Sequence, residues 1–514
     1  MSDVYPELII GIVGRMGVDT VTAAKWIDAT LHSLHYRSHV IKLTDYLAEV
    51  DVGVTLVDEP IEQRYETRID ACNKVRELAN RKDFFASVAI SGITSTRENV
   101  TPSTDGPTRQ AYIIDQIKRP EEAKALREVY GEQFILVSCH TPMEERISSL
   151  AGKIAGGHAG KPKPDTWASA AKHLIDIDNS EASKDFGQRV GKVFHLADMI
   201  IDCSSETGSK HTLKRFFEAL FGNPTVSPTR PEFFQNIAMN VALTSCDTAR
   251  QVGAAIERQG DIAATGYNEA PKAGGGTYWS NDGFDARDVA LGMDLNTIRK
   301  RQMVTEVVQI LRERNELSDN EITDAEISKK YLDDENAPLQ DSQIMDTLEF
   351  GRAVHAEMAA LSTAARLGIS TLGSTLYCTT FPCHNCSKHI VASGVSKVVY
   401  LEPYPKSFAD YLYPDSILID PVTKKNGLVV FEQFVGITPV RYRSLFQKSS
   451  SKDGRGYVAQ WEPRKSFPVL TSKYQEHFER EIIFQKKMLD SVTKFSPQNA
   501  TTLGLRKEAP DPTE

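Results

Sequence analysis

Apolar positions recur along the chain with two different spacings, and each spacing predicts a type of element. Four short apolar runs in the first part of the chain are typical of buried strands: Leu8–Val13, Phe84–Ile90, Phe134–Ser138 and Met199–Asp202. Helical patterns lie between these runs, and the first of them reaches to about Leu34. Strands that alternate with helices favour a parallel sheet with both faces covered. The pattern therefore predicts an α/β domain over residues 1–222.

A second domain follows a proline-rich segment. Residues 223–232 contain three prolines together with Ser and Thr, which predicts a linker. A helix and two short strands joined by a turn at Gly260 come next. Further along, the apolar spacing predicts a helix that begins near His355, a strand at Leu372–Thr379 and a second helix that Pro382 opens. Elements in this order predict a three-layer α/β/α sandwich over residues 233–446.

A long insertion, residues 273–350, interrupts this second domain. It begins with a glycine-rich, aromatic stretch, Gly274–Trp279, and continues through helical runs at Met303–Leu311 and Ile322–Tyr331. A loop of this length inside a compact domain is either functional or disordered, and the helical runs favour order. Residues 447–514 form a C-terminal extension, and we expect its polar tail from about Pro497 to be loose.

Three residues of the second domain form a pattern of potential metal ligands. The order H-x-E … P-C-x-x-C, here His355, Glu357, Cys383 and Cys386, is the signature of zinc nucleobase deaminases. One histidine and two cysteines leave the fourth tetrahedral position of Zn²⁺ open, which is typical of a catalytic metal. Both cysteines fall in the first turn of a predicted helix, where the helix N-terminus stabilises thiolates.

This pattern predicts hydrolytic deamination of a cytosine ring. A water molecule at the open zinc position becomes a nucleophile near neutral pH. Glu357 is expected to move a proton from that water to the ring nitrogen and then to the leaving amine. A purely structural zinc site would need a fourth Cys or His at ligand spacing, and it would leave Glu357 without a role.

Three further residues are candidates for binding the substrate. Asn268 ends a strand that is expected to approach the metal, where its amide could read a sugar hydroxyl. A simple turn residue is the alternative, and position alone favours that alternative. Lys406 and Ser407 follow the predicted strand Lys397–Leu401 and are expected to hold a substrate phosphate.

The first domain opens with a strand, a glycine turn and a helix, which is the layout of a phosphate-binding loop. Its candidate nucleotide-binding residues are Gly14, Arg15, Gly17, Asp19 and Thr20. If Gly17 is the second glycine of the loop, Val18 occupies the position of the usual lysine. Two interpretations remain open, nucleotide binding without turnover and a structural relic. We expect a regulatory nucleotide or a partner to bind here.

Composition excludes several classes of protein. The net charge of −9 over 514 residues provides no basic field to hold bulk nucleic acid. Seven scattered cysteines predict a reducing cytoplasmic environment and no disulfide framework. The N-terminal sequence lacks a basic flank and a long apolar core, so no signal peptide is predicted. No apolar run reaches membrane-spanning length, so no membrane contact is expected.

Several motifs together resemble one known family. SCDTARQVGA, GYNEAP, GGGTYW, GRAVHAEM, TTFPCHNC and EPYPKS are similar to the bacterial antiphage deoxycytidylate deaminases. The resemblance covers roughly residues 8–446. It implies a degenerate P-loop kinase-like domain followed by a zinc deaminase domain. It also implies deamination of dCTP and dCMP, which drains the cytosine nucleotide pool during phage infection. In some systems such proteins are held inactive by a small RNA. A homo-oligomer is also expected.

Two other functions remain open. A deaminase that edits tRNA or single-stranded DNA would need a basic groove with stacking aromatic residues, and this acidic chain shows no clear groove. A nonenzymatic nucleotide sensor with a relic zinc site is the second alternative. The presence of Glu357 argues against it.

Overall fold

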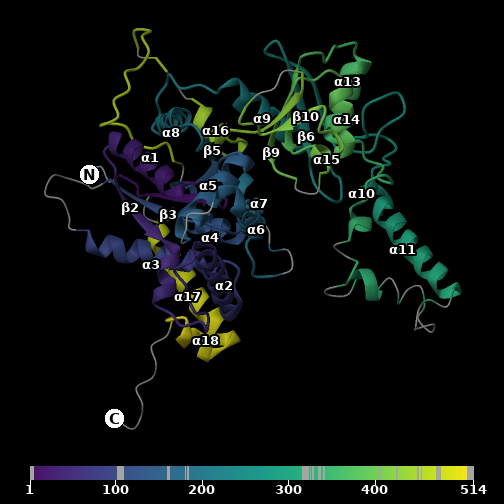
Figure 1. Ribbon diagram of the computed structural model, residues 1–514. Helices are drawn as coiled ribbons and strands as arrows, with labels where there is room; N and C mark the ends of the chain where they lie inside the picture. The colour runs from purple at the N-terminus through teal and green to yellow at the C-terminus, as the bar shows by residue number, and fades with distance from the viewer. Residues whose placement is uncertain are drawn as a thin grey trace. The chain divides into compact units, whose positions relative to one another are not determined.

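The structure is a computed structural model. It describes residues 5–100, 109–158, 163–179, 181, 184–314, 316, 323, 326, 329–333, 337–339, 342–404, 407–423, 427–448, 451–452, 454–470 and 476–505. The chain divides into two compact units, each described below by itself (Figure 1). The first unit contains Met1–Glu232, Asp420–Thr423 and Gln433–Glu514, and the second contains Phe233–Ile419 and Lys424–Glu432. Residues 223–232 and 433–446 thus pack with the first unit.

The first unit is built on a six-stranded sheet with the order β12-β5-β4-β1-β3-β2. Its strands are β1 (Leu8–Gly14), β2 (Arg37–Lys42), β3 (Gln110–Asp115), β4 (Phe134–His140), β5 (Met199–Asp202) and β12 (Gly436–Ile437). All pairings are parallel except that of β12 with β5. Every residue of β1 and β4 is buried, as expected for central strands covered on both faces.

Helices cover this sheet and account for most of the first unit. The longer helices are α1 (Thr20–Ser33), α2 (Ile61–Ala79), α3 (Phe84–Asn99), α4 (Pro120–Tyr130), α5 (Met143–Gly157), α6 (Ala168–Asn179), α8 (Glu206–Leu220), α16 (Pro439–Phe446) and α17 (Glu476–Phe495). The shorter ones are η1 (Leu43–Ala48), η2 (Gly131–Gln133), η3 (Pro164–Trp167), α7 (Val190–Val193), η4 (Phe194–Leu196) and α18 (Pro497–Thr502).

One predicted strand of the first unit is wrong. Phe84–Ile90 forms the first two turns of helix α3, in which the Ser87 hydroxyl donates to the Phe84 carbonyl. Nearly every residue in these turns is buried, so the sequence shows a continuous apolar run that does not distinguish a strand from a buried helix. Strands β2 and β3 were not predicted. The side chains of β2, an edge strand, are mostly exposed or half-buried, and its sequence is correspondingly polar.

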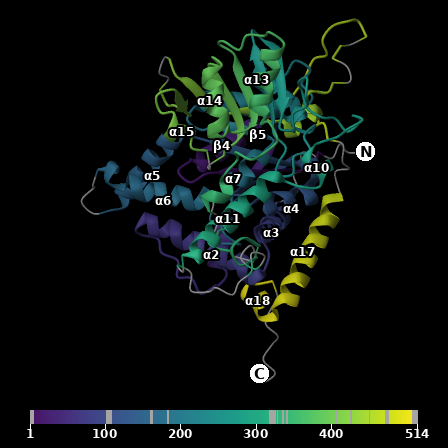
Figure 2. The ribbon, with the colours of Figure 1, turned by 90° about the vertical axis from the view of Figure 1, so that its right-hand side faces the viewer.

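The C-terminal part of the chain is more ordered than expected. Helix α17 packs against α3 and α4 (Figure 2), and Arg97 of α3 binds both Glu481 of α17 and Glu7 beside β1. The expected loose tail from Pro497 instead forms helix α18, in which Asn499 Nδ2 donates to the Leu78 carbonyl at 2.8 Å. Residues 506–514 lie outside the described part of the chain.

The second unit is built on its own six-stranded sheet with the order β10-β11-β9-β8-β6-β7. Its strands are β6 (Gly253–Arg258), β7 (Asp261–Tyr267), β8 (Thr375–Thr380), β9 (Lys397–Glu402), β10 (Ile417–Ile419) and β11 (Val429–Gln433). β6 and β7 form the predicted antiparallel hairpin, and β8 pairs with β9 in parallel. The mixed α/β class predicted from the sequence is confirmed for both units.

Helices α9 (Arg230–Ala242), α13 (Ala356–Arg366), α14 (His384–Ala392) and α15 (Ala409–Leu412) accompany this sheet. Helix α13 packs closely on the hairpin, because a Cβ at Gly266 would lie 2.2 Å from the backbone nitrogen of Ala360. Only glycine permits that approach. The resulting core contains Cys383 and Cys386 among its buried residues.

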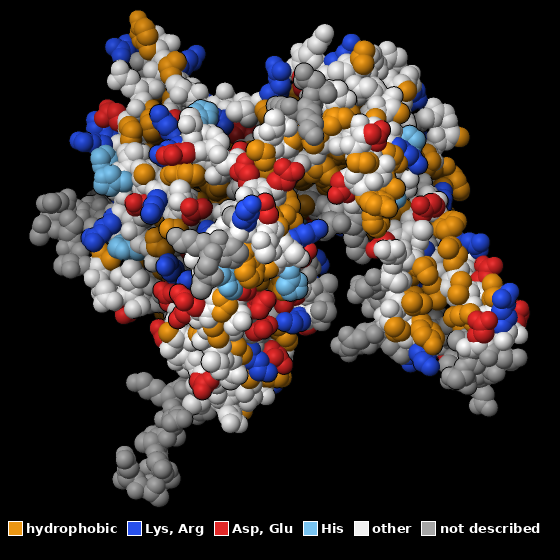
Figure 3. Space-filling model, in the orientation of Figure 1, with side chains coloured by type: hydrophobic (Ala, Val, Ile, Leu, Met, Phe, Trp, Pro, Cys, Tyr) orange, Lys and Arg blue, Asp and Glu red, His pale blue; other side chains and the backbone are white. Residues whose placement is uncertain are grey.

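The insertion in the second unit contains helices α10 (Asp288–Leu291) and α11 (Leu295–Glu313), the π-helical turn η5 (Lys329–Asp333) and η6 (Gln343–Asp346). The predicted run Met303–Leu311 lies within α11, whereas half of Ile322–Tyr331 lies outside the described residues. Hydrophobic side chains gather on the visible face of this helical part (Figure 3), and its exposed members include Met293, Ile298, Val307 and Ile310. Within the described chain, none of the helices combines the length and apolarity needed to cross a membrane.

Candidate metal centre and pocket

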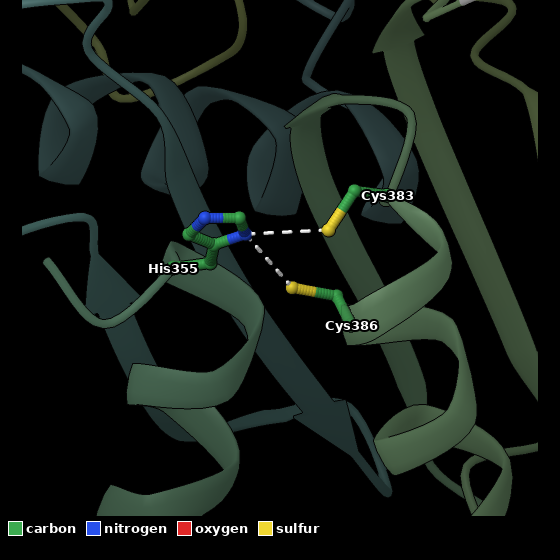
Figure 4. Close-up of side chains that lie close together, drawn as sticks. All are labelled: His355, Cys383 and Cys386. Carbon is green, nitrogen blue, oxygen red and sulfur yellow. Dashed lines mark hydrogen bonds between the residues drawn. The ribbon is translucent and has the colours of Figure 1, made fainter. Parts of the chain in front are cut away.

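Two helix starts bring the predicted metal ligands together. His355 occupies the N-cap position of α13. The preceding residue, Val354, exchanges two backbone hydrogen bonds with Glu269, which follows the hairpin. Cys383 occupies the N-cap position of α14, and Cys386 lies in the first turn of that helix. Helix α14 therefore begins at His384, two residues after the predicted start at Pro382, but both sulfur atoms still face the histidine (Figure 4).

The distances between the three side chains fit a tetrahedral metal. Cys383 Sγ and Cys386 Sγ lie 3.3 and 3.4 Å from His355 Nδ1. Zn²⁺ at roughly 2.3 Å from sulfur and roughly 2.1 Å from nitrogen would hold such atoms roughly 3.6 Å apart. Among the described residues, this is the one group of three or more potential ligands with all donor atoms within 4.8 Å of one another. The donor set of one imidazole and two thiols suits zinc.

The close side chains of His355, Cys383 and Cys386 shift one another's pKa values. Hydrogen bonding from Cys386, against the effect of burial, lowers the pKa of the Cys383 thiol to about 4. The hydrogen bond to Cys383 raises the pKa of His355 to about 9. Ligation requires a neutral imidazole and a thiolate, so metal uptake releases protons from this group.

Glu357 lies beside the ligands without belonging to their cluster. Its side chain is buried in the first turn of α13, and Cys386 Sγ approaches Glu357 Oε2 at 3.5 Å. Burial, followed by the nearby negative charge of Cys383, raises the pKa of Glu357 to about 7. A carboxyl group with a near-neutral pKa can both accept and return a proton during a reaction.

His355, Cys383 and Glu357 line a pocket of about 270 Å³. This size is of the order of a small-molecule site, which begins at roughly 300 Å³. Its lining comes from the segment before β6, the hairpin end, the insertion, the start of α13 and the segments after β8 and β9, and it includes Asn268, Asp294, Phe381 and Tyr404. The insertion therefore forms part of the pocket wall.

The predicted substrate-binding residues have different positions. Asn268 lines the pocket, but its Oδ1 accepts from Val252 N at 2.7 Å and its Nδ2 donates to the Arg250 carbonyl at 2.8 Å. One donor and one acceptor valence remain on this amide. Ser407 donates to the Pro382 carbonyl at 2.9 Å and so fastens the turn before Cys383. Lys406 lies outside the described residues.

Sequence reasoning missed two arginines that line the pocket, Arg250 and Arg352. Both occur inside motifs that carried the resemblance, SCDTARQVGA and GRAVHAEM. In the sequence, the positive charge of these two residues was the signal that could have pointed to them. The fold shows that both line the same pocket as His355.

The glycine turn between β1 and α1 of the first unit is hydrogen-bonded to side chains of the same unit. Asp178 of α6 accepts the backbone N–H of Met16 at 2.7 Å and pairs with Lys118 Nζ at 2.7 Å. Lys118 also donates to the Gly14 carbonyl at 3.0 Å. A carboxylate thus occupies one of the backbone donors that a phosphate would use.

The remaining residues predicted for this turn have structural partners. Asp19 caps α1 through Thr22, the Thr20 hydroxyl accepts from Gln116, and the Arg15 guanidinium lies 4.2 Å from the centre of the Phe194 ring. At Gly17, φ is +92° and a Cβ would lie 2.8 Å from the Arg146 carbonyl oxygen. Gly17 therefore has no room for a side chain.

Comparison with known proteins places the metal centre in a described family region. Residues 228–402 match the family described as the cytidine and deoxycytidylate deaminase zinc-binding region. The second unit therefore contains a zinc-binding domain of the deaminase type. The metal of this domain is Zn²⁺, and the group of His355, Cys383 and Cys386 could hold it.

The relatives of this domain include phage deoxycytidylate deaminases. The enzyme of Enterobacteria phage T4 is 43% identical over 76 residues, which are 14% of this chain and 39% of the T4 enzyme. The chain thus matches less than half the length of that relative. The enzyme of phage T2 is 29% identical over 198 residues, which are 38% of this chain and 87% of the T2 enzyme.

A solved structure is also similar. The dCMP deaminase of cyanophage S-TIM5, crystallised with dCMP and dUMP, covers 40% of this chain and 98% of its own, at 22% identity. The TM-score is 0.23, and a similarity at that level carries no functional weight. Homology of the second unit to deoxycytidylate deaminases therefore rests on the sequence matches.

Proposed function

We propose that this chain hydrolyses the exocyclic amine of deoxycytidine nucleotides and converts dCMP and dCTP to dUMP and dUTP. The observation that carries this proposal is the placement of buried Glu357 beside the His355, Cys383 and Cys386 centre at one small pocket. The deoxycytidylate deaminases among the sequence relatives support nucleotide substrates.

His355, Cys383 and Cys386 would hold the zinc ion. When bound, zinc supplies Lewis acidity that makes water a nucleophile near neutral pH. Glu357 takes a proton from the attacking water and delivers it to N3 of the cytosine ring. It then moves the proton of the hydroxyl on C4 to the exocyclic amine, which leaves as ammonia while the C4 carbonyl forms. The position of this carboxyl group, with Oε2 3.5 Å from Cys386 Sγ, places it beside the metal ligands, where it can transfer protons in both directions. The spare valences of Asn268 are available to a sugar hydroxyl. Lys406 and Ser407, which follow β9 in the sequence, are proposed to hold a substrate phosphate.

A free nucleotide fits the pocket better than a polynucleotide. The pocket is of small-molecule size and carries several carboxylates, among them Asp247, Asp288 and Asp294. A polynucleotide site would instead present a basic track with stacking platforms. Editing of tRNA or single-stranded DNA, and nucleotide sensing without turnover, are therefore outcomes that the substrate test must distinguish.

The test is ammonia release from the purified full-length protein loaded with zinc. The substrates are deoxycytidine, dCMP, dCTP, CTP and a cytosine-containing single-stranded oligonucleotide. We expect release from dCMP and dCTP. Release from the oligonucleotide alone would support an editing enzyme, and no release from any of them would support a nonenzymatic sensor.

We further propose a role in antiphage defence, in which deamination drains the cytosine nucleotide pool of the cell. The proposal rests on the family resemblance. We propose with it that the protein acts in the cytoplasm as a homo-oligomer and that, as in some such systems, a small RNA inhibits it. The test compares phage plaque counts and cellular dCTP in cells that express the wild-type protein or the Glu357→Gln variant. Equal plaque counts would contradict the defence role without affecting the enzymatic proposal.

We propose that residues 1–222, which belong to the first unit, form a degenerate P-loop kinase-like domain that responds to a regulatory nucleotide. The parallel order β2-β3-β1-β4-β5 and the glycine turn after the first strand support this proposal. A nucleotide phosphate at Met16 would have to displace the Asp178 carboxylate. Titration of dCMP deamination with dTTP, dGTP and ATP tests for such a response. Identical responses to these nucleotides in the wild type and an Asp178→Asn variant would argue for a structural relic.

A further inference from the structure

An ion pair joins two segments of the pocket wall in the second unit. Arg352, three residues before His355, donates from Nη1 to the Asp288 carboxylate at 2.8 Å. The same nitrogen donates to the Ala286 carbonyl at 2.8 Å. Both Arg352 and Asp288 line the pocket, and their side chains are 29% and 17% exposed. The pair therefore connects the insertion with the segment that carries the metal ligand.

Arg352 retains donors for a ligand. A guanidinium group has five N–H donors in a rigid plane that matches phosphate oxygens. Both recorded bonds leave from Nη1, and within the described part of the chain no bond is recorded from Nε or Nη2. The Arg352 guanidinium lines the pocket, is partly exposed, and can donate from Nε and Nη2 to a bound anion.

The other charges of the pocket make such a donor necessary for an anionic substrate. Asp294 caps helix α11 by accepting from the Asn296 and Thr297 backbone, and Asp247 accepts from the Ala249 backbone. Neither carboxylate is paired with a cation across the pocket in the described contacts. A nucleotide that enters this lining must offset the repulsion between its phosphates and these carboxylates.

We propose that Arg352 binds the phosphate of the substrate nucleotide, and that Asp288, by pairing with Arg352, lowers the preference of the site for polyphosphates. The inference rests on the proposed deaminase function. With its cytosine at the metal centre, a nucleotide must direct its phosphate away from Glu357, toward the pocket wall. Asp288 then competes for Arg352 and repels added phosphates, so its effect increases from dCMP to dCTP.

Arg250 is the competing candidate for the same role. It also lines the pocket, but its side chain is 48% exposed and its nearest carboxylate, Glu402, lies at 4.0 Å. An exposed and weakly held arginine contributes less to a specific site than a partly buried one with a fixed partner. Arg352 is therefore the favoured phosphate ligand.

The experiment measures binding separately from turnover. Calorimetry on the full-length Glu357→Gln protein gives dissociation constants for deoxycytidine, dCMP and dCTP, before and after adding Arg352→Gln, Asp288→Asn or Arg250→Gln. In parallel, ammonia release by the proteins with Glu357 intact gives kcat and KM for the same ligands. Zinc content and melting temperature establish that each variant is folded.

We expect opposite effects from the two partners. Arg352→Gln should weaken dCMP binding by roughly 10- to 100-fold, the loss of one charge-assisted hydrogen bond, and leave deoxycytidine nearly unchanged. Asp288→Asn should strengthen dCTP binding by roughly threefold or more, with a smaller gain for dCMP. In the Arg352→Gln background, Asp288→Asn should retain only the part of this effect that comes from direct repulsion between the Asp288 carboxylate and the added phosphates, because the competition for Arg352 is gone.

Two results would overturn the inference. One is an equal loss of deoxycytidine and dCMP binding in Arg352→Gln, which would show that this residue only supports the fold. The other is a phosphate-dependent loss in Arg250→Gln alone. Failure of the deaminase function is distinguishable, because the phosphate dependence of binding would then persist while no protein released ammonia.

The insertion offers matched controls. Asp282→Asn removes a carboxylate that pairs with Lys272 at 2.9 Å, and Arg301→Gln removes a cation that pairs with Asp333. Neither pair lines the pocket. Both controls should leave the ratio of dCTP to deoxycytidine affinity as in the parent protein, and a shift equal to that of Asp288→Asn would contradict the assignment.

Discussion

An ionic cluster joins helix α17 to the rest of the first unit. It should make the stability of that unit decrease at acidic pH. Glu7, beside β1, contacts His477 of α17 and Arg97 of α3. Burial raises the pKa of Glu7, but hydrogen bonds from His477 and Arg97 outweigh burial and lower the pKa from 4.5 to about 2. Arg97 also binds Glu481 of α17 at 2.9 Å. The folded state therefore holds Glu7 ionised to a lower pH than the unfolded chain does.

The magnitude follows from linkage between protonation and folding. A shift of roughly 2.5 pH units corresponds to about 3.4 kcal/mol of stability, at roughly 1.36 kcal/mol per unit. Because the folded pKa is the lower one, this stability is present above about pH 4.5 and is lost as the pH falls toward 2. Between pH 7 and pH 3, protonation of Glu7 should cost about 2 kcal/mol.

The assay is urea unfolding of the wild type and Glu7→Gln at several pH values from 7 to 3. Tryptophan fluorescence reports on the first unit through Trp26, Trp167 and Trp461. The variant should be less stable at pH 7, and the difference from the wild type should shrink by about 2 kcal/mol at pH 3. Subtracting the two proteins removes the contribution of other acidic groups. A difference that stays constant with pH would refute the reasoning.

Three further changes test the metal centre and the glycine turn. Cys383→Ala should lose zinc and destabilise the second unit together, because metal binding contributes to folding; metal analysis that still finds one zinc per chain would contradict the ligand assignment. Glu357→Gln should keep zinc and fold but lower ammonia release from dCMP by at least roughly 10²- to 10⁴-fold, the usual contribution of a positioned proton donor and acceptor. Gly17→Ala should destabilise the first unit by roughly 1–3 kcal/mol in thermal unfolding, because the residue has a positive φ and no space for Cβ; an unchanged melting temperature would show that the turn adapts.

Sequence spacing determined the metal centre almost completely. His355, Cys383 and Cys386 each lie at the start of a helix, and a local motif fixes where their side chains point within one turn. The β6–β7 hairpin and the order of the later elements were equally readable, because short-range apolar patterns set them. The first strand and the glycine turn were predicted for the same reason.

The tertiary structure decided what local patterns do not encode. Phe84–Ile90 is helical, but nearly all of its residues are buried against neighbouring elements, so the sequence shows no helical period. The Asp178 carboxylate reaches Met16 from a position 162 residues away. Asp288 and Arg352 are likewise separated by 64 residues and meet only because the insertion folds back onto the pocket. A charge in the sequence carries no information about its distant partner, so these contacts depend on the fold.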